Sequence, residues 1–77
     1  MEKTIAGIVA GICGVEPEEL EPGLNLFDEG LLDSFGVIQL VLALEDAFSV
    51  SLEIENIPRE RIATVSNIAG LIREVAS

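Results

Sequence analysis

Apolar residues recur at helical spacing in the first part of the chain. Between residues 2 and 13 they fall at i, i+3, i+4 and i+7, the stripe of an amphipathic helix. The stripe consists of Ile5, Ile8, Val9 and Ile12. Gly14 stands where a helix commonly ends. We therefore predict a first helix over residues 2–13.

A second periodic stretch, residues 34–48, carries apolar residues on two faces. Ser34 follows an acidic, glycine-containing loop and precedes the apolar run, so we predict it to be the N-cap. At 100° per residue, one face gathers the side chains expected in the core: Val37, Leu40, Val41, Leu44, Ala47 and Phe48. The opposite side carries Phe35, Ile38 and Leu42. We predict a second helix that is apolar on both sides.

A third stripe follows Thr64, which is predicted to cap a last helix that runs to the C-terminus. Its members are Val65, Ile68, Ala69, Ile72 and Val75. Before it, Asn56 and Pro58 are typical of the start of a helix, and residues 56–62 suffice for one to two turns. Residues 49–54 alternate like a strand. Because no second strand could pair with them, we predict an extended loop.

Residues 15–33 form a long connection punctuated by Pro17, Pro22 and Gly23. Spaced apolar residues favour an ordered loop anchored in the core, with a turn of helix at residues 17–20. The anchors are Leu20, Leu24, Leu26 and Phe27. The expected fold is all-α, a small four-helix bundle of three main helices and one short helix, in a single domain over residues 1–77.

The amino-acid composition excludes several kinds of catalytic and metal site. Apolar residues make up 49% of the chain but aromatic residues only 4%, and there is no Trp, Tyr or His. The core must be aliphatic, and a Ser-His-Asp triad cannot be built, so we expect no enzyme. The single Cys13 excludes an internal disulfide and a multi-cysteine metal site, and it suits a reducing cytoplasm.

The net charge of −10 is concentrated in one part of the chain. Eleven of the 14 acidic residues lie between Thr4 and Pro58, where there is no Lys or Arg. We therefore expect no nucleic acid partner and no membrane insertion, but attraction to basic protein surfaces. The alternative is that the acids merely keep a small apolar domain soluble. Gly30 and Leu32 occupy positions where a calcium loop needs oxygen ligands, so no metal site is predicted.

The start of the second helix is the most informative stretch. Unpaired N–H groups and the helix dipole favour a negative group such as a phosphate beside Ser34. Asp33-Ser34-Phe35 resembles the Asp-Ser-Leu motif of the carrier protein family, with Phe35 in place of the usual Leu or Met. Residues 26–34, with Gly30 four positions before the serine, most resemble the D-alanyl carrier proteins. Fatty-acid carriers usually have the glycine three positions before it.

This resemblance implies a 4′-phosphopantetheine arm on Ser34, whose thiol holds an acyl or aminoacyl group. The resemblance to D-alanyl carriers implies that this group is D-alanine, for the modification of cell-envelope polymers. It implies that Asp33 supports the modification by helping to bind the magnesium of the modifying enzyme. The implied partners are a phosphopantetheinyl transferase, an acid-activating ligase such as a D-alanine ligase, and an acyltransferase or synthase. We expect the protein itself to be a monomer. Ser34 as a plain cap and Asp33 as a solvated loop acid are the alternatives.

Two further functions stay open from the sequence. The chain is also compatible with a stand-alone acyl carrier of a fatty-acid, polyketide or other specialised pathway, or with an acidic helical interaction module without covalent cargo. We predict a partner-binding face on the outward side of the second helix, where apolar side chains lie beside acids. It comprises Phe35, Ile38, Leu42, Glu45 and Asp46. The alternative is that its apolar residues complete the core.

Overall fold

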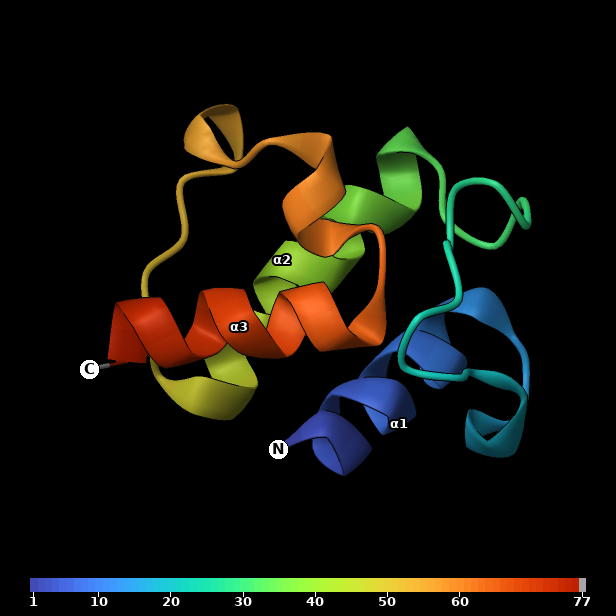
Figure 1. Ribbon diagram of the computed structural model, residues 1–77. Coiled ribbons are helices and arrows are strands. Elements are labelled where there is room, and N and C mark those ends of the chain that lie inside the picture. The colour runs from blue at the N-terminus through green and yellow to red at the C-terminus, as the bar shows by residue number, and fades with distance from the viewer. Residues whose placement is uncertain (77) are drawn as a thin grey trace.

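The computed structural model describes residues 1–76, which contain three α-helices, three short 3₁₀ turns and no β-strand (Figure 1). The helices are α1 (Glu2–Cys13), α2 (Ser34–Phe48) and α3 (Val65–Ala76). The 3₁₀ turns are η1 (Pro17–Glu19), η2 (Ile54–Asn56) and η3 (Arg59–Ile62). The all-α prediction and the bounds of the first two main helices are confirmed. The predicted helical turn in the long connection is η1.

The predicted count of four helices is not confirmed. Where a short helix was expected over residues 56–62, the structure has the end of η2 and the whole of η3. Ile57 and Pro58 between them are extended, with φ −103° and ψ 111° at Ile57. A proline disfavours helical geometry in the residue before it, and it has no N–H to donate, so the two turns cannot join into one helix.

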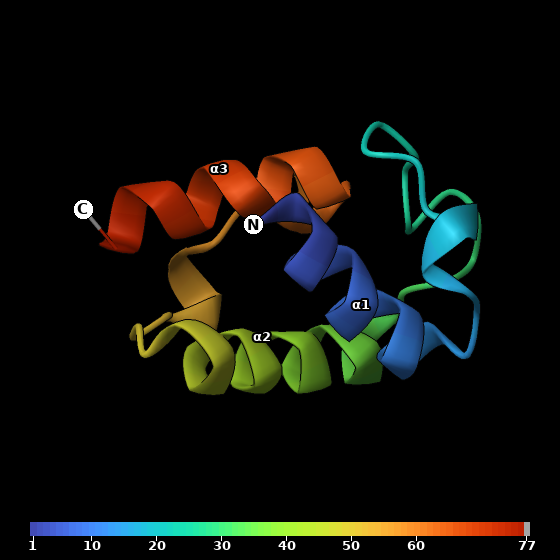
Figure 2. The same cartoon turned by 90° about the horizontal axis from the view of Figure 1, so that it is seen from below.

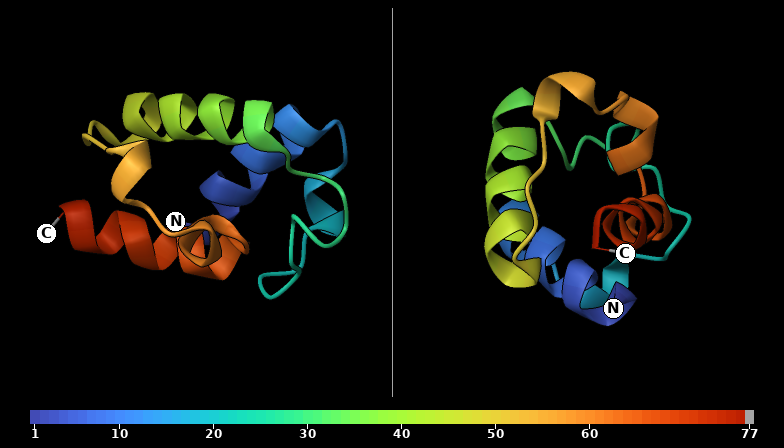
Figure 3. Two further views of the ribbon diagram at one scale, coloured as in Figure 1. Left: turned by 90° about the horizontal axis from the view of Figure 1, so that it is seen from above. Right: turned by 90° about the vertical axis from the view of Figure 1, so that its left-hand side faces the viewer.

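α1 crosses obliquely between the other two helices and packs against both (Figure 2). α2 and α3 run in the same sense on either side of it, as the view from above also shows (Figure 3). The three helices enclose an aliphatic core without a buried polar residue in the described chain. Its fully buried large side chains are Ile5, Val9, Leu26, Leu40, Leu44, Val65, Ile68 and Ile72.

The ends of the helices follow local sequence signals. Gly14 takes the left-handed conformation at φ 75°, and its N–H donates to the carbonyl of Ala10 at 2.9 Å. A residue with a side chain would be strained there. At the start of α3, the Thr64 hydroxyl accepts a hydrogen bond from the N–H of Asn67 at 3.0 Å, which confirms the predicted cap.

Two side chains predicted to lie in the core do not. Ala47 is exposed in the last turns of α2, and Val75 is 42% exposed near the end of α3. Figure 2 shows that α1 meets α2 nearer its start, so the far ends of α2 and α3 project beyond the crossing helix. Helical periodicity identified which face of each helix turns toward the core. It did not show where along α2 and α3 the packing against α1 ends.

The long connection is ordered, as predicted. Leu20 and Leu26 are buried, and Leu24 and Phe27 pack against the core from its edge. The N–H of Leu26 donates to the carbonyl of Ala63 at 2.7 Å, which fixes the connection to the segment before α3. Within the described residues, no helix is both long and apolar enough to cross a membrane.

Candidate functional site

Asp33, and not Ser34, is the N-cap of α2. Asp33 is extended at φ −125° and ψ −176°, and its Oδ1 accepts a hydrogen bond from the N–H of Gly36 at 2.7 Å. Both residue types are favourable caps, so the sequence alone did not distinguish them. The prediction that Ser34 caps the helix is wrong, because the preceding residue, Asp33, occupies the cap position and its carboxylate accepts the hydrogen bond from the N–H of Gly36.

Ser34 is consequently the first residue of α2, with its hydroxyl unused by the fold. The side chain is exposed. No hydrogen bond to its Oγ is made within residues 1–76. The hydroxyl can therefore be modified without breaking an interaction that holds the helix start.

Gly36 adds a packing constraint to this first turn. It is buried, and a Cβ placed on it would lie 3.1 Å from Leu32 Cδ1 and 3.3 Å from Asp33 Oδ1. The missing side chain lets Leu32 reach the core while Asp33 stays close enough to cap the helix. This role of Gly36 could not be predicted from the sequence, because close approach at a glycine depends on neighbours that only the fold positions.

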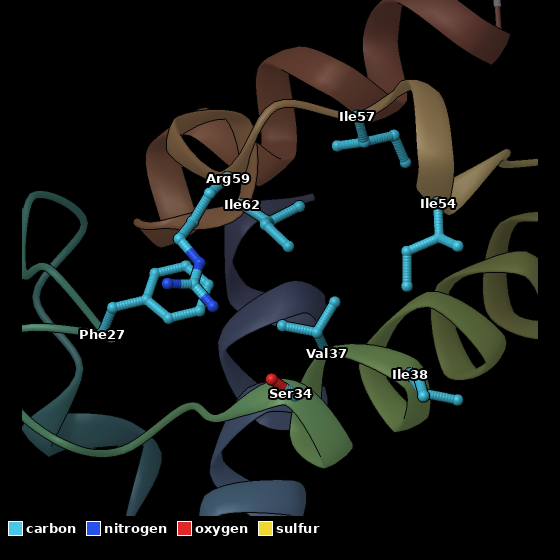
Figure 4. A pocket seen from close by; sticks show the side chains of 8 residues that line it. All are labelled: Phe27, Ser34, Val37, Ile38, Ile54, Ile57, Arg59 and Ile62. Atoms are coloured by element: carbon cyan, nitrogen blue, oxygen red, sulfur yellow. The ribbon is translucent and has the colours of Figure 1, made fainter.

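A pocket of about 330 Å³ opens beside Ser34 (Figure 4). Its walls come from α2, from the two turns that replace the predicted short helix, and from Phe27 of the long connection. The lining is largely aliphatic: Val37, Ile38, Ile54, Ile57 and Ile62, in addition to Phe27, Ser34 and Arg59. A group attached to the Ser34 hydroxyl would thus begin at the edge of an apolar hollow.

Phe27 and Arg59 form a stacked pair at this pocket. The Arg59 guanidinium carbon lies 4.5 Å from the centre of the Phe27 ring, a cation–π geometry. Phe27 is held in place because the side chain of Asn25 accepts hydrogen bonds from the N–H groups of Phe27 and Asp28, each at 3.0 Å. The pair could not be predicted from the sequence, because no short-range signal connects these two positions.

The predicted partner-binding face is exposed. Phe35, Ile38 and Leu42 have exposed fractions of 68%, 50% and 60%, so they do not complete the core. Asp46 is exposed, whereas Glu45 is half-buried and accepts a hydrogen bond from the N–H of Leu52 at 2.8 Å. Glu45 therefore also holds the loop that follows α2.

Cys13, the last residue of α1, contacts the long connection that leads to α2. Its Sγ donates a hydrogen bond to the carbonyl of Leu31 at 2.9 Å. Burial raises the pKa of the Cys13 thiol, and the negative charge of Asp33 raises it further. The thiol is free, and the described part of the chain contains no group of three or more Cys, Asp or Glu residues that could hold a metal ion.

Comparison with known proteins identifies the family. The family model described as a phosphopantetheine attachment site matches residues 3–72. The chain belongs to this phosphopantetheine-binding family. It is a carrier protein with a phosphopantetheine attachment site. Carrier proteins of this family are not catalytic themselves, and membership implies interaction with a phosphopantetheinyl transferase and with ligases or synthases.

Individual relatives align with most of this chain. A D-alanyl carrier protein of Bacillus velezensis is 30% identical over 96% of this chain and 95% of its own length. One from Lactococcus lactis subsp. cremoris is 35% identical over 96% and 94%. An acyl carrier protein of Syntrophobacter fumaroxidans is 41% identical over 88% and 82%. The resemblance to D-alanyl carriers is thus confirmed.

The residues at the start of α2 fit the group that this family carries. A phosphopantetheine arm is joined through a phosphodiester to a serine hydroxyl, and it needs a hydroxyl that is exposed and not engaged in the fold. Ser34 meets both requirements and lies at the edge of an open pocket. When bound, the arm supplies a thiol for thioester chemistry, while the chain's own residues position the point of attachment.

The cap geometry gives a prediction for Asp33. Asp33→Ala should lower the free energy of unfolding by about 1 kcal/mol, because the N–H of Gly36 loses its acceptor. Asp33→Asn should keep most of the stability, since an amide oxygen caps equally well. Urea denaturation measures both, with Asp46→Ala as a control for loss of an exposed acid on the same helix. Equal losses for the Asn and Ala variants would contradict the capping role.

Proposed function

We propose that Ser34 is the attachment site of the phosphopantetheine arm, and that the protein presents a thioester without catalysing its formation or transfer. The observation that carries this proposal is the exposed hydroxyl of Ser34, which is free of hydrogen bonds in the first turn of α2. It lies within the stretch that matches the family, directly after the capping Asp33.

Attachment would join Ser34 Oγ to the pantetheine-bearing phosphorus of coenzyme A. One P–O bond forms at the serine, and the pyrophosphate bond of coenzyme A breaks. Adenosine 3′,5′-bisphosphate leaves, and the hydroxyl proton goes to a base of the transferase. The chain has no His and so no side chain that ordinarily titrates near neutral pH. This is consistent with activation of Ser34 by a partner enzyme.

Intact-mass spectrometry tests the site. Wild-type protein incubated with coenzyme A and a broad-specificity phosphopantetheinyl transferase should gain one arm, and Ser34→Ala should gain none while remaining folded. Ser66→Ala is the matched control, because Ser66 is also an exposed serine in the first turn of a helix. Ser34 is not the attachment site if its Ala variant is modified or if the wild type is not.

For Asp33 we propose a second role besides capping, in support of the modification. Its Oδ1 is occupied by the N–H of Gly36, but the side chain as a whole is exposed next to Ser34. A carboxylate in this position is available to a magnesium ion brought by the transferase. Asp33→Asn separates the two roles, since it retains the cap and removes the charge.

The outward face of α2 is the proposed docking surface for these enzymes. The side chains of Phe35 and Leu42 are more than half exposed, and that of Ile38 is half exposed. The exposed acid Asp46 lies on the same helix. Apolar contact area combined with negative charge suits a partner with a basic, apolar groove. Glu45 contributes its charge from the edge of this face, although it also holds the following loop.

Leu42 and Leu44 form a matched pair for testing this surface. Leu42→Ala should reduce kcat/KM of the transferase for the carrier but leave the free energy of unfolding within about 0.5 kcal/mol. Leu44 is fully buried, so Leu44→Ala should cost ~2–5 kcal/mol of stability. A large loss of stability in Leu42→Ala, or unchanged transferase kinetics, would contradict the docking role.

D-Alanine is the cargo that we propose first. Support comes from the D-alanyl carriers that are 30–35% identical over most of the chain. A D-alanine ligase would load the thiol, and an acyltransferase would unload it toward cell-envelope polymers. A second candidate, an acyl group of another biosynthetic pathway, is favoured by the relative named as an acyl carrier protein, which is 41% identical, and by the aliphatic lining of the pocket.

Parallel loading distinguishes these cargoes. The arm-bearing protein is offered to a D-alanine-activating ligase and to a fatty-acyl-activating ligase, and the thioester formed is weighed. We expect the D-alanyl thioester. Loading with a fatty acyl group alone would overturn the D-alanine assignment and leave the carrier role intact. As a control for the type of bond, the loaded wild-type protein is treated with hydroxylamine, which cleaves thioesters and should return it to the mass of the arm-bearing protein.

A further inference from the structure

The pocket beside Ser34 has an uneven charge distribution. Among the described residues that line it, Arg59 alone is charged, and the others are aliphatic, aromatic or the serine itself. Figure 4 shows the Arg59 side chain against the Phe27 ring, at the end of the pocket formed by η3 and the long connection, with Ser34 bordering the same hollow. A cation is thus placed at an apolar pocket in a chain whose net charge is −10.

The guanidinium of Arg59 is not neutralised by the fold. Within residues 1–76, no carboxylate oxygen lies within 4.0 Å of the Arg59 guanidinium. The nearby Arg61, by contrast, forms an ion pair with Glu74. The contact of the Arg59 guanidinium is with the face of Phe27, which leaves the N–H donors at its edge available. The stack also restricts the side chain before any ligand arrives, so that less conformational entropy is lost on binding.

We infer that Arg59 pairs with the phosphodiester of the arm on Ser34 and thereby turns the arm into the pocket. This inference rests on the proposed attachment at Ser34. The phosphodiester carries one negative charge and is attached directly to Ser34 Oγ, so it is confined to the region that Arg59 borders. Guanidinium groups recognise phosphate oxygens with paired N–H donors, for which a lysine is a weaker substitute.

The local charges explain why the pairing would matter. Asp33 precedes the attachment point, and the two acids Asp28 and Glu60 line a second hollow, whose wall also includes Phe27 and Arg59. These carboxylates repel an anionic arm, whereas Arg59 attracts it. The arm would then lie along Ile54 and Ile57 and not along Phe35 and Leu42, which do not line the pocket, while Ile38 borders both the pocket and the docking face. Arg59 is a positioning residue in this arrangement and forms no bond to the cargo.

Nuclear magnetic resonance of the apo and arm-bearing protein tests this directly. Arm addition should shift the backbone amide signals of Ile54 and Ile57 and slow exchange of the Arg59 guanidinium protons by about two- to fivefold, the range expected for an exposed ion pair. Arg59→Gln should lose the amide shifts, and Arg59→Lys should retain part of them. Arg61→Gln is the matched control and should retain all of them.

The outcomes separate the inference from the function on which it rests. If mass spectrometry shows the arm on Ser34 but the Arg59 signals are the same with and without it, the inference is wrong and the carrier role stands. The same holds if Arg59→Gln and Arg61→Gln behave alike. Failure of the wild type to gain an arm refutes the attachment proposal, and the inference falls with it. Raising the salt to 1 M should reduce the wild-type shifts, because the pair is exposed.

Discussion

The anchoring of Leu26 is the constraint on which the geometry of the site depends. Its side chain is fully buried, and its N–H donates to the carbonyl of Ala63. Its own carbonyl accepts from the N–H groups of Leu31 and Leu32 at 2.9 and 3.2 Å, which folds the connection back on itself. Leu26 thus helps to position Phe27 on one side and the start of α2 on the other, together with the hydrogen bonds of Asn25 and Asp33. A loop without that anchor would not bring them to a common pocket.

Much of the fold could be predicted because a small aliphatic domain has few ways to bury three periodic stripes. The stripes placed α1, α2 and α3, and Thr64 signalled the start of the last helix. The predictions went wrong where two local signals compete. Asp33 and Ser34 are both good caps, and only the structure shows that Asp33 takes this position, because its Oδ1 accepts the hydrogen bond from the N–H of Gly36. Pro58 likewise divides a segment that composition alone would allow to be one helix.

The sequence was sufficient to locate the candidate site along the chain, but not to predict the pocket beside it. Ser34 and the exposed strip on α2 follow from motif and periodicity, because both belong to one continuous segment. The pocket does not, since its walls come from α2, from η2 and η3, and from the long connection. No pattern in the sequence reports that Phe27 and Arg59 stack. Such contacts depend on the path of irregular segments, whose backbone has no period to be read.

The half-buried thiol of Cys13 bears on how long a thioester survives. A thioester is vulnerable to any nearby thiolate, and a carrier with a reactive cysteine of its own would lose cargo by transfer to itself. The Sγ of Cys13 instead donates to the Leu31 carbonyl, and burial together with the charge of Asp33 raises its pKa. The thiol therefore stays protonated at neutral pH and is a poor nucleophile. The fold keeps the one sulfhydryl encoded in the chain from competing for the group that the arm delivers.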